Sequence, residues 1–252
     1  MIRVLSGVVL AAAALAAILF LPPIGLRILA CVVAALAAHE YLRLVGGHDG
    51  QIGGVVIFTW LVSSGSIAIL AWIPMVALLV AGANTLYSRF SFSAAVLGAF
   101  AVVYISVPLG LLAALHISRG WRTTLLLIAT VVVSDSLQYY TGRAFGRRPL
   151  APTISPKKTI EGAIGGVIAG TLFMVFAGRI VFPAYSWPWL AALGLVSVLL
   201  GILGDLFESR LKRDAHVKDS SSLIPGHGGV LDRIDALLFV TPMFAIALGA
   251  VK

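Results

Sequence analysis

Apolar spans of about 20 residues recur along the whole chain and limit its fold more than any other feature, because each is long enough to cross a bilayer. The composition agrees: 60% of the residues are hydrophobic, 11% are charged, and the mean hydropathy is +1.05. A soluble domain carries about 25% charged residues. The sequence therefore predicts an all-α, polytopic integral membrane protein, since a barrel would show short alternating segments instead.

The spans predict about nine transmembrane helices. Only Pro74 separates the third helix from the fourth, and Pro108 is expected to kink the fifth. The single cysteine, Cys31, lies inside an apolar span, which excludes an intramolecular disulfide. The predicted helices cover residues 4–21, 24–45, 53–72, 74–87, 92–116, 121–140, 160–182, 187–211 and 230–250.

Two regions are expected: an N-terminal transmembrane region at 1–120, and a C-terminal catalytic region at 121–252 with two polar loops. Most of the 18 lysines and arginines fall at the N-terminus and in the loops after the second, fourth, sixth and eighth helices. The positive-inside rule therefore places the N-terminus and both polar loops in the cytoplasm, in a multi-pass protein of the cell inner (plasma) membrane. The net charge of +8 is attributed to cations that set the membrane topology and contact the lipid bilayer, and no nucleic-acid partner is expected.

Acidic residues gather at three places near the predicted helix ends, where ionisable groups are costly and usually functional. Asp135 lies on the sixth helix. The structural alternative to a functional role is that hydroxyl groups in the helix bundle simply satisfy its carboxylate. Asp205 ends a long uncharged stretch of the eighth helix and shares a face with Glu208. An exposed pair with Lys212 is the structural alternative for Glu208, but it fits Asp205 poorly. The ninth helix begins with two further acids, and the helix dipole accounts for only one of them. These last two are Asp232 and Asp235.

Glycines and cations lie beside these acids. The turn at 225–229 exposes backbone N–H groups near a helix N-terminus, which forms either an anion site or a plain turn. The neighbouring cations favour phosphate binding: Lys212, Arg213, Lys218 and Arg233. The segment 155–162 adds a second cationic edge, for which positive-inside anchoring is the alternative.

Oxygen ligands from two helices suit Mg²⁺, which usually binds one or two carboxylates together with substrate phosphates. The chain has no Gly-Lys pair and therefore no Walker A loop, and it has neither a His-Glu-x-x-His nor a Gly-x-Ser-x-Gly motif. Among the histidines, only His227 is placed in the site. The spacing of Gly162, Gly166 and Gly170 is interpreted as a helix-packing stripe.

The segment Ser209–Asp235 resembles the signature of the phosphatidate cytidylyltransferases, the CDP-diacylglycerol synthases. The segments 155–162 and 142–146 also resemble parts of that family, and the likeness lies mostly within 130–236. Family members commonly read Asp-Thr-x-Ala-Tyr on the sixth helix, whereas this chain has Asp135-Ser-Leu-Gln-Tyr139, which leaves the role of Gln138 open. The matching positions are Ser209, Lys212, Arg213, Lys218, Asp219, His227, Gly228, Gly229, Asp232, Arg233 and Asp235.

The resemblance implies transfer of a cytidylyl group from CTP to phosphatidic acid, with Mg²⁺ and a second cation such as K⁺. Asp205 and Asp232 are expected to hold Mg²⁺, with Asp235 and Asp135 as further ligands. Lys218 and Asp219 complete the catalytic set, in which Asp219 is expected to organise the loop. The expected substrate-binding residues are Ser155, Lys157, Lys158, Ser209, Lys212, Arg213, His227, Gly228, Gly229 and Arg233.

Two other functions remain open on the sequence. A CTP-dependent lipid kinase would use a similar site but release CDP instead of pyrophosphate. A transporter with carboxylates at the midplane is a second alternative, although the acids gather on one side and no broken-helix repeats are evident. The oligomeric state is also open, with a homodimer among the candidates.

Overall fold

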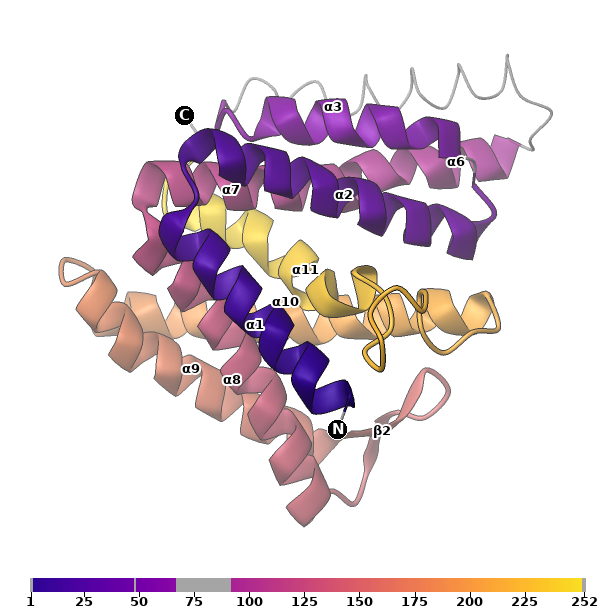
Figure 1. Cartoon of the computed structure of the whole chain (residues 1–252). Helices are drawn as coiled ribbons and strands as arrows, with labels where there is room; N and C mark the ends of the chain where they lie inside the picture. The colour runs from indigo at the N-terminus through magenta and orange to yellow at the C-terminus, as the bar shows by residue number, and fades with distance from the viewer. Residues whose placement is uncertain (1, 48, 67–91, 251–252) are drawn as a thin grey trace.

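A computed structural model describes residues 2–47, 49–66 and 92–250 of the chain, and this part is mostly helical (Figure 1). Apolar spans form these helices because a helix satisfies all its backbone polar groups internally, as hydrocarbon requires. The helices are α1 (Ile2–Phe20), α2 (Pro23–Val45), α3 (Ile52–Val62), α6 (Phe92–Ala101), α7 (Val107–Arg119), α8 (Trp121–Phe145), α9 (Ile160–Val181), α10 (Trp187–Asp214) and α11 (Leu231–Ala247).

Four helical segments of the described part are long and apolar enough to cross a membrane: Pro23–Val45, Ala99–Arg119, Ile160–Val181 and Trp187–Asp214. The helix predicted over 53–72 ends earlier, at Val62, because a turn follows and Gly65 has a φ of 75°. The helix predicted over 74–87 lies outside the described residues. The membrane-protein class is therefore supported, and the number of nine helices stays a prediction.

The helix changes type just before Pro108, where the sequence predicts a kink. A π-helical turn, Val102–Ser106, lies between α6 and α7 and directly precedes the first turn of α7, which contains the proline. Proline has no N–H to donate to the carbonyl four residues before it, so the backbone there must rearrange. Single π turns are a common form of that rearrangement within α-helices.

The glycine stripe of α9 packs against α8, as predicted, and all three of its glycines are buried. A Cβ on Gly166 would lie 2.2 Å from Gln138 Cγ and 2.9 Å from the carbonyl oxygen of Ser134. On Gly170 it would lie 2.5 Å from Val198 Cγ2, which belongs to α10. The absence of side chains at these positions therefore lets α9 approach both neighbouring helices closely.

The substitution Gly166→Ala should lower stability by about 1–3 kcal/mol, because the added methyl group overpacks the α8–α9 contact. Gly53→Ala is the matched control, since Gly53 lies in a helix and a methyl group added there would meet nothing within 4 Å. Thermal unfolding in detergent measures both variants. Equal midpoints for the two would contradict the packing role.

The polar segment at 142–158, which the sequence predicts as a loop, contains a short β-hairpin within a chain that is otherwise mostly helical, as predicted. Strands β1 (Pro149–Ala151) and β2 (Ser155–Thr159) pair antiparallel, with Pro149 opposite Thr159. Glu161 in the first turn of α9 fixes the base of the hairpin by accepting from the N–H groups of Arg147 (3.0 Å) and Arg148 (3.2 Å). Both strands are short, and only β2 is polar, so their sequence carries no alternating hydrophobic signal.

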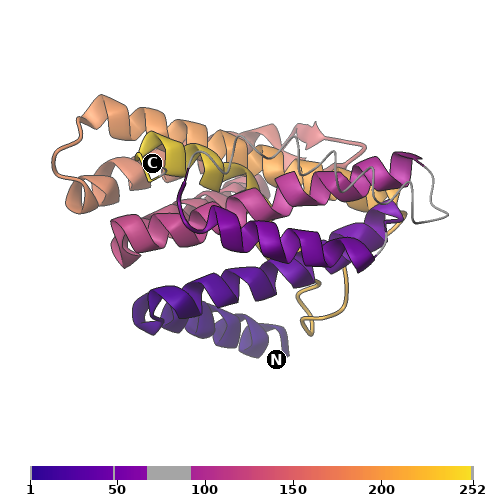
Figure 2. The ribbon, with the colours of Figure 1, turned by 90° about the horizontal axis from the view of Figure 1, so that it is seen from above.

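Three polar parts of the chain meet at one end of the helix bundle. The hairpin, the C-terminal end of α2 and the loop between α10 and α11 lie together there, on the right in Figure 1. Figure 2, viewed from above, shows the same three parts at the same end. The fold therefore gathers segments from the start, middle and end of the sequence into one polar region.

Candidate functional site

Asp205 on α10 meets Lys158 on β2. The two side chains form an ion pair, and both are about a quarter exposed. Ser209 Oγ, one turn further along α10, donates to Asp205 Oδ1 (3.3 Å). The hairpin thus brings a cation of the segment 155–162 to the acid of the eighth predicted helix.

Lys212 joins α10 to α11 through two carboxylates. Its Nζ forms an ion pair with Glu208 on the same helix and lies 2.5 Å from Asp232 Oδ1 on α11. The interpretation of Glu208 and Lys212 as an exposed pair is wrong, because Glu208 is only 1% exposed. Removing one member of such a buried group leaves an uncompensated charge, which is strongly destabilising.

Asp232 also fastens the loop that precedes α11. Its Oδ2 accepts hydrogen bonds from the N–H of Ser220 (2.9 Å), the hydroxyl of Ser220 (2.8 Å) and the N–H of Gly229 (2.8 Å). A carboxylate that accepts several hydrogen bonds is held in one orientation. Asp232 therefore fixes both ends of the segment between Ser220 and Gly229.

Three other acids come from three different helices. Asp135 on α8, Asp205 on α10 and Asp235 on α11 are close enough for their charges to repel one another. Gln138 donates to Asp135 Oδ1 (3.0 Å), which gives this departure from the family pattern a role in orienting the acid. Among the described residues, no three acidic, histidine or cysteine side chains converge closely enough to form a ready metal site.

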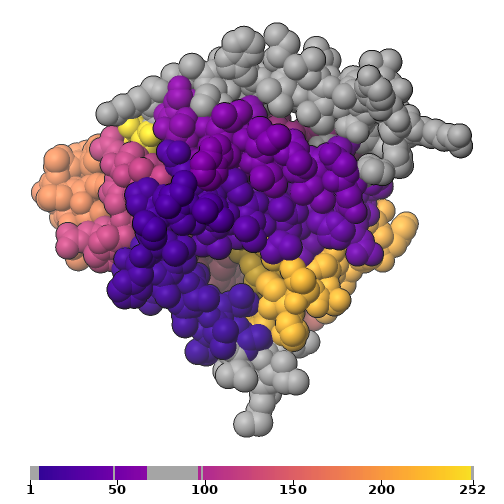
Figure 3. Space-filling view, turned by 45° about the horizontal axis from the view of Figure 1, so that its top comes forward, coloured from indigo at the N-terminus to yellow at the C-terminus, as the bar shows by residue number. Residues whose placement is uncertain are grey.

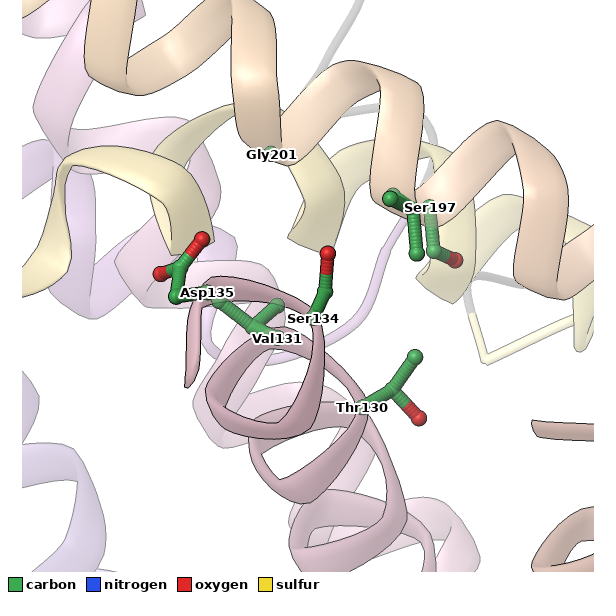
Figure 4. A pocket seen from close by; sticks show the side chains of 7 residues that line it. Thr130, Val131, Ser134, Asp135, Ser197 and Gly201 are labelled. Atoms are coloured by element: carbon green, nitrogen blue, oxygen red, sulfur yellow. The ribbon is translucent and has the colours of Figure 1, made fainter. Parts of the chain in front are cut away.

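A pocket separates α8 from α10 beside Asp135 (Figure 4). Ser134 and Thr130 line it from α8, and Ser197 and Gly201 line it from α10. The hydroxyls of Thr130 and Ser197 donate to carbonyl oxygens of their own helices, at Leu126 (2.7 Å) and Leu193 (2.7 Å). Asp135 also lines this pocket, together with Val131 and Val198.

The glycine-rich turn has a specific conformation. Gly226 and Gly228 have φ values of 76° and 80°, which favour glycine. Two of the turn's N–H groups are already bonded, since His227 donates to the carbonyl of Ile224 (2.9 Å) and Gly229 donates to Asp232. The predicted amide cluster at 226–229 is therefore partly used by the protein itself.

The other predicted residues occupy the surrounding loop and hairpin. Arg213 Nε donates to the carbonyl of Ile154 (3.2 Å), which joins α10 to the hairpin. His227 Nδ1 lies 2.9 Å from Ser6 Oγ, so the loop also contacts α1. Ser155 is half-buried in β2. The remaining predicted residues are exposed on the hairpin, the loop and the start of α11: Lys157, Lys218, Asp219 and Arg233.

Glu40 on α2 was not predicted as a site residue, although the structure places it at the centre of this region. It is 2% exposed and accepts hydrogen bonds from the hydroxyls of Ser220 (2.8 Å) and Ser221 (2.7 Å). It also accepts from the N–H groups of Val230 (3.0 Å) and Leu231 (2.8 Å). The sequence signal that could have identified Glu40 was a carboxylate near the end of an apolar span.

Comparison with known proteins identifies the family. The model of the cytidylyltransferase family matches residues 1–251. The chain is 32% identical to a phosphatidate cytidylyltransferase of Haemophilus influenzae, over 96% of this chain and 96% of the relative. It is 31% identical to one of Bacillus subtilis, over 98% and 97% respectively. A Thermotoga maritima enzyme of the same name is 37% identical over 60% of each chain.

The matches with the Haemophilus and Bacillus proteins run almost from end to end, so they include the N-terminal helices as well as the polar region. The segment from Ser209 to Asp235, which resembles the family signature, forms most of the network around Lys212 and Asp232. The chain belongs to the cytidylyltransferase family.

Proposed function

We propose that this chain transfers a cytidylyl group from CTP to phosphatidic acid, giving CDP-diacylglycerol and pyrophosphate for phospholipid biosynthesis. The family and the names of the end-to-end relatives support this reaction. One structural observation carries it furthest: acids and cations from β2, α10 and α11 converge at one end of an apolar bundle. A soluble nucleotide and a membrane lipid can both reach such a position.

The reaction is a direct displacement. A phosphate oxygen of the lipid attacks the α-phosphorus of CTP, the bond to the oxygen bridging to the β-phosphorus breaks, and pyrophosphate leaves with that electron pair. Such chemistry needs positioning and charge neutralisation more than covalent participation. The chain therefore acts mainly by holding two phosphate groups in line.

The cations divide between the two substrates. Lys157 and Lys158 on the hairpin meet the lipid phosphate, and the loop and the start of α11 hold the phosphates of CTP. Lys212 is buried between two carboxylates, and it contributes to the nucleotide site by fixing the position of Asp232. The residues assigned to the nucleotide are Lys212, Arg213, Lys218, Arg233 and the amides of 226–229.

Magnesium is the expected cofactor, and the donor chemistry fits it. Asp205 and Asp232 would hold the ion, with Asp235 and Asp135 as further ligands, because hard oxygen donors suit Mg²⁺. Bound there, the ion would neutralise the charge that develops on the phosphates. The mutual repulsion of Asp135, Asp205 and Asp235 supports a cation site, since a dication would relieve it. A second cation such as K⁺ beside it is part of the same proposal.

The proposed architecture has about nine transmembrane helices, with the site on the cytoplasmic side of the inner membrane. The lysines and arginines of the hairpin and of the α10–α11 loop support this orientation. A reporter fused after Lys252 that proved cytoplasmic would contradict it. The proposed regions 1–120 and 121–252 both contribute, because Glu40 of the first contacts Ser220 of the second.

Purified protein with labelled CTP and phosphatidic acid tests the function. We expect CDP-diacylglycerol and pyrophosphate in the presence of Mg²⁺, and neither product after chelation. Formation of CDP with a polyprenol-like alcohol would instead identify a lipid kinase. No product with either lipid acceptor, from protein that elutes as one folded species, would reject both.

A further inference from the structure

Glu40 is the buried acid of the N-terminal region, and its hydrogen-bond partners lie near the other end of the sequence. A carboxylate has about four acceptor positions on its two oxygens, and the contacts of Glu40 use four donors. Oε1 accepts from Ser221 Oγ and the N–H of Val230, and Oε2 accepts from Ser220 Oγ and the N–H of Leu231. Each oxygen thus binds one hydroxyl and one backbone amide.

The two amides belong to the N-terminus of α11, which begins at Leu231. The first N–H groups of a helix have no partner within it, and the helix dipole favours a negative charge there. The N-cap residue, Val230, offers no side-chain oxygen. Glu40 therefore caps α11 from another helix, and this supplies the compensation that a buried carboxylate requires.

Ser220 connects Glu40 to the proposed metal ligand. Its Oγ lies 2.8 Å from Glu40 Oε2 and 2.8 Å from Asp232 Oδ2. A hydroxyl has one proton to donate, so Ser220 shares it between the two carboxylates and links them. Gly229 is equally constrained, because a Cβ there would lie 2.1 Å from Ser220 Oγ and 2.2 Å from Glu40 Oε2.

The surfaces of the two regions meet where these contacts form. In the space-filling view, the yellow-orange loop between α10 and α11 lies directly against the indigo and purple N-terminal helices (Figure 3). Val217, the loop residues 219–223 and the end of α2 also line a common pocket that includes Glu40 and Arg43. The nucleotide loop therefore rests on α2 beside this pocket.

We propose that Glu40 is a positioning residue for the reaction: it holds Ser220, Ser221 and the start of α11 in the geometry that binds CTP. This inference rests on the proposed function of the loop. Glu40 acts through Ser220 and Asp232, not through contact with a substrate. The N-terminal helices then determine nucleotide affinity as well as membrane anchoring.

The substitution Glu40→Gln tests the proposal. It keeps the shape but replaces one oxygen by an NH₂ group that faces a backbone N–H. We expect the KM for CTP to rise by roughly 10-fold or more, because hydrogen bonds to a charged group are lost and a donor is left unpaired. The KM for phosphatidic acid should stay within about twofold, since no described contact joins Glu40 to the hairpin. Amide hydrogen exchange at Val230 and Leu231 should become faster in the substrate-free protein.

Asp49→Asn is the matched control. It makes the same acid-to-amide change close to Glu40 in the sequence, but Asp49 is exposed and contacts His39. This variant should retain wild-type KM values and exchange rates. Ser221→Ala is a milder variant that removes one donor to Glu40 and should shift the same KM by a smaller factor. In the double variant, the two effects should be non-additive because the residues share a contact.

The outcomes separate this inference from the proposed function. A Glu40→Gln protein with unchanged exchange at Val230 and Leu231, or with an unchanged KM for CTP, would overturn the positioning role. An equal rise in KM for both substrates would also overturn it, because the effect would then be a general loss of structure. An unmodified protein that makes no CDP-diacylglycerol would reject the function, while the exchange measurement would still report whether Glu40 orders the loop. If Glu40→Gln does not fold, Ser221→Ala provides the same comparison.

Discussion

Replacing Asp205 with asparagine should lower kcat by roughly 10²–10³-fold, the usual cost of losing one charge-stabilising contact at a reacting group. Asparagine has nearly the same shape but no charge, so it binds a divalent cation poorly. The side chain projects from α10 toward Lys158 and is hydrogen-bonded by Ser209. The variant should still insert and fold, because Asp205 is about a quarter exposed and is no part of the helix core. Cytidylyl transfer from labelled CTP measures the loss.

Asp214→Asn provides the control for Asp205. Asp214 lies on the same helix, carries the same charge and forms an exposed ion pair with Arg210 four residues before it. Such surface pairs contribute at most about 1 kcal/mol, so this variant should keep nearly wild-type kcat. Near-normal turnover by Asp205→Asn would remove Asp205 from the proposed metal site. Asp232→Asn should be equally inactive, but it also loses contacts to Ser220 and Gly229 and is therefore a less specific test.

Replacing Lys212 with methionine should lower the free energy of unfolding by about 3–5 kcal/mol, because the buried carboxylates of Glu208 and Asp232 lose their shared cation. Methionine keeps much of the length and the apolar stem of lysine, so packing changes little. The loss follows from burial: Glu208 is 1% exposed, and its Oε1 has no hydrogen-bond partner among the described residues. Thermal unfolding in detergent measures the change.

A second substitution separates stability from function at this position. Adding Glu208→Gln to Lys212→Met removes one of the uncompensated charges and should recover part of the stability. Activity should remain low, because Asp232 would still lack the ammonium group that fixes it. Arg210→Met, which breaks only the exposed pair with Asp214, is the control. A Lys212→Met protein as stable as that control would contradict the buried network.

The positions of most described helices could be predicted because the bilayer imposes a strong, local requirement: a continuous apolar segment of sufficient length. α9, for example, was predicted at 160–182 and spans Ile160–Val181. The short strands of the hairpin could not be predicted, since their pairing depends on Glu161 and on the end of α10. Hydropathy also does not specify which polar segments meet.

The sequence by itself determined the membrane class, the family resemblance, and the concentration of acids, cations and glycines between Ser209 and Asp235. Those properties depend on residue type and spacing along one stretch of chain. Only the tertiary structure decided that Lys158 reaches Asp205, that Lys212 is buried between Glu208 and Asp232, and that Glu40 caps α11. Each of these contacts joins groups whose positions depend on how the helices pack. A hydrogen bond across 191 positions leaves no local pattern in the sequence, because its geometry exists only once α2 lies against the loop before α11.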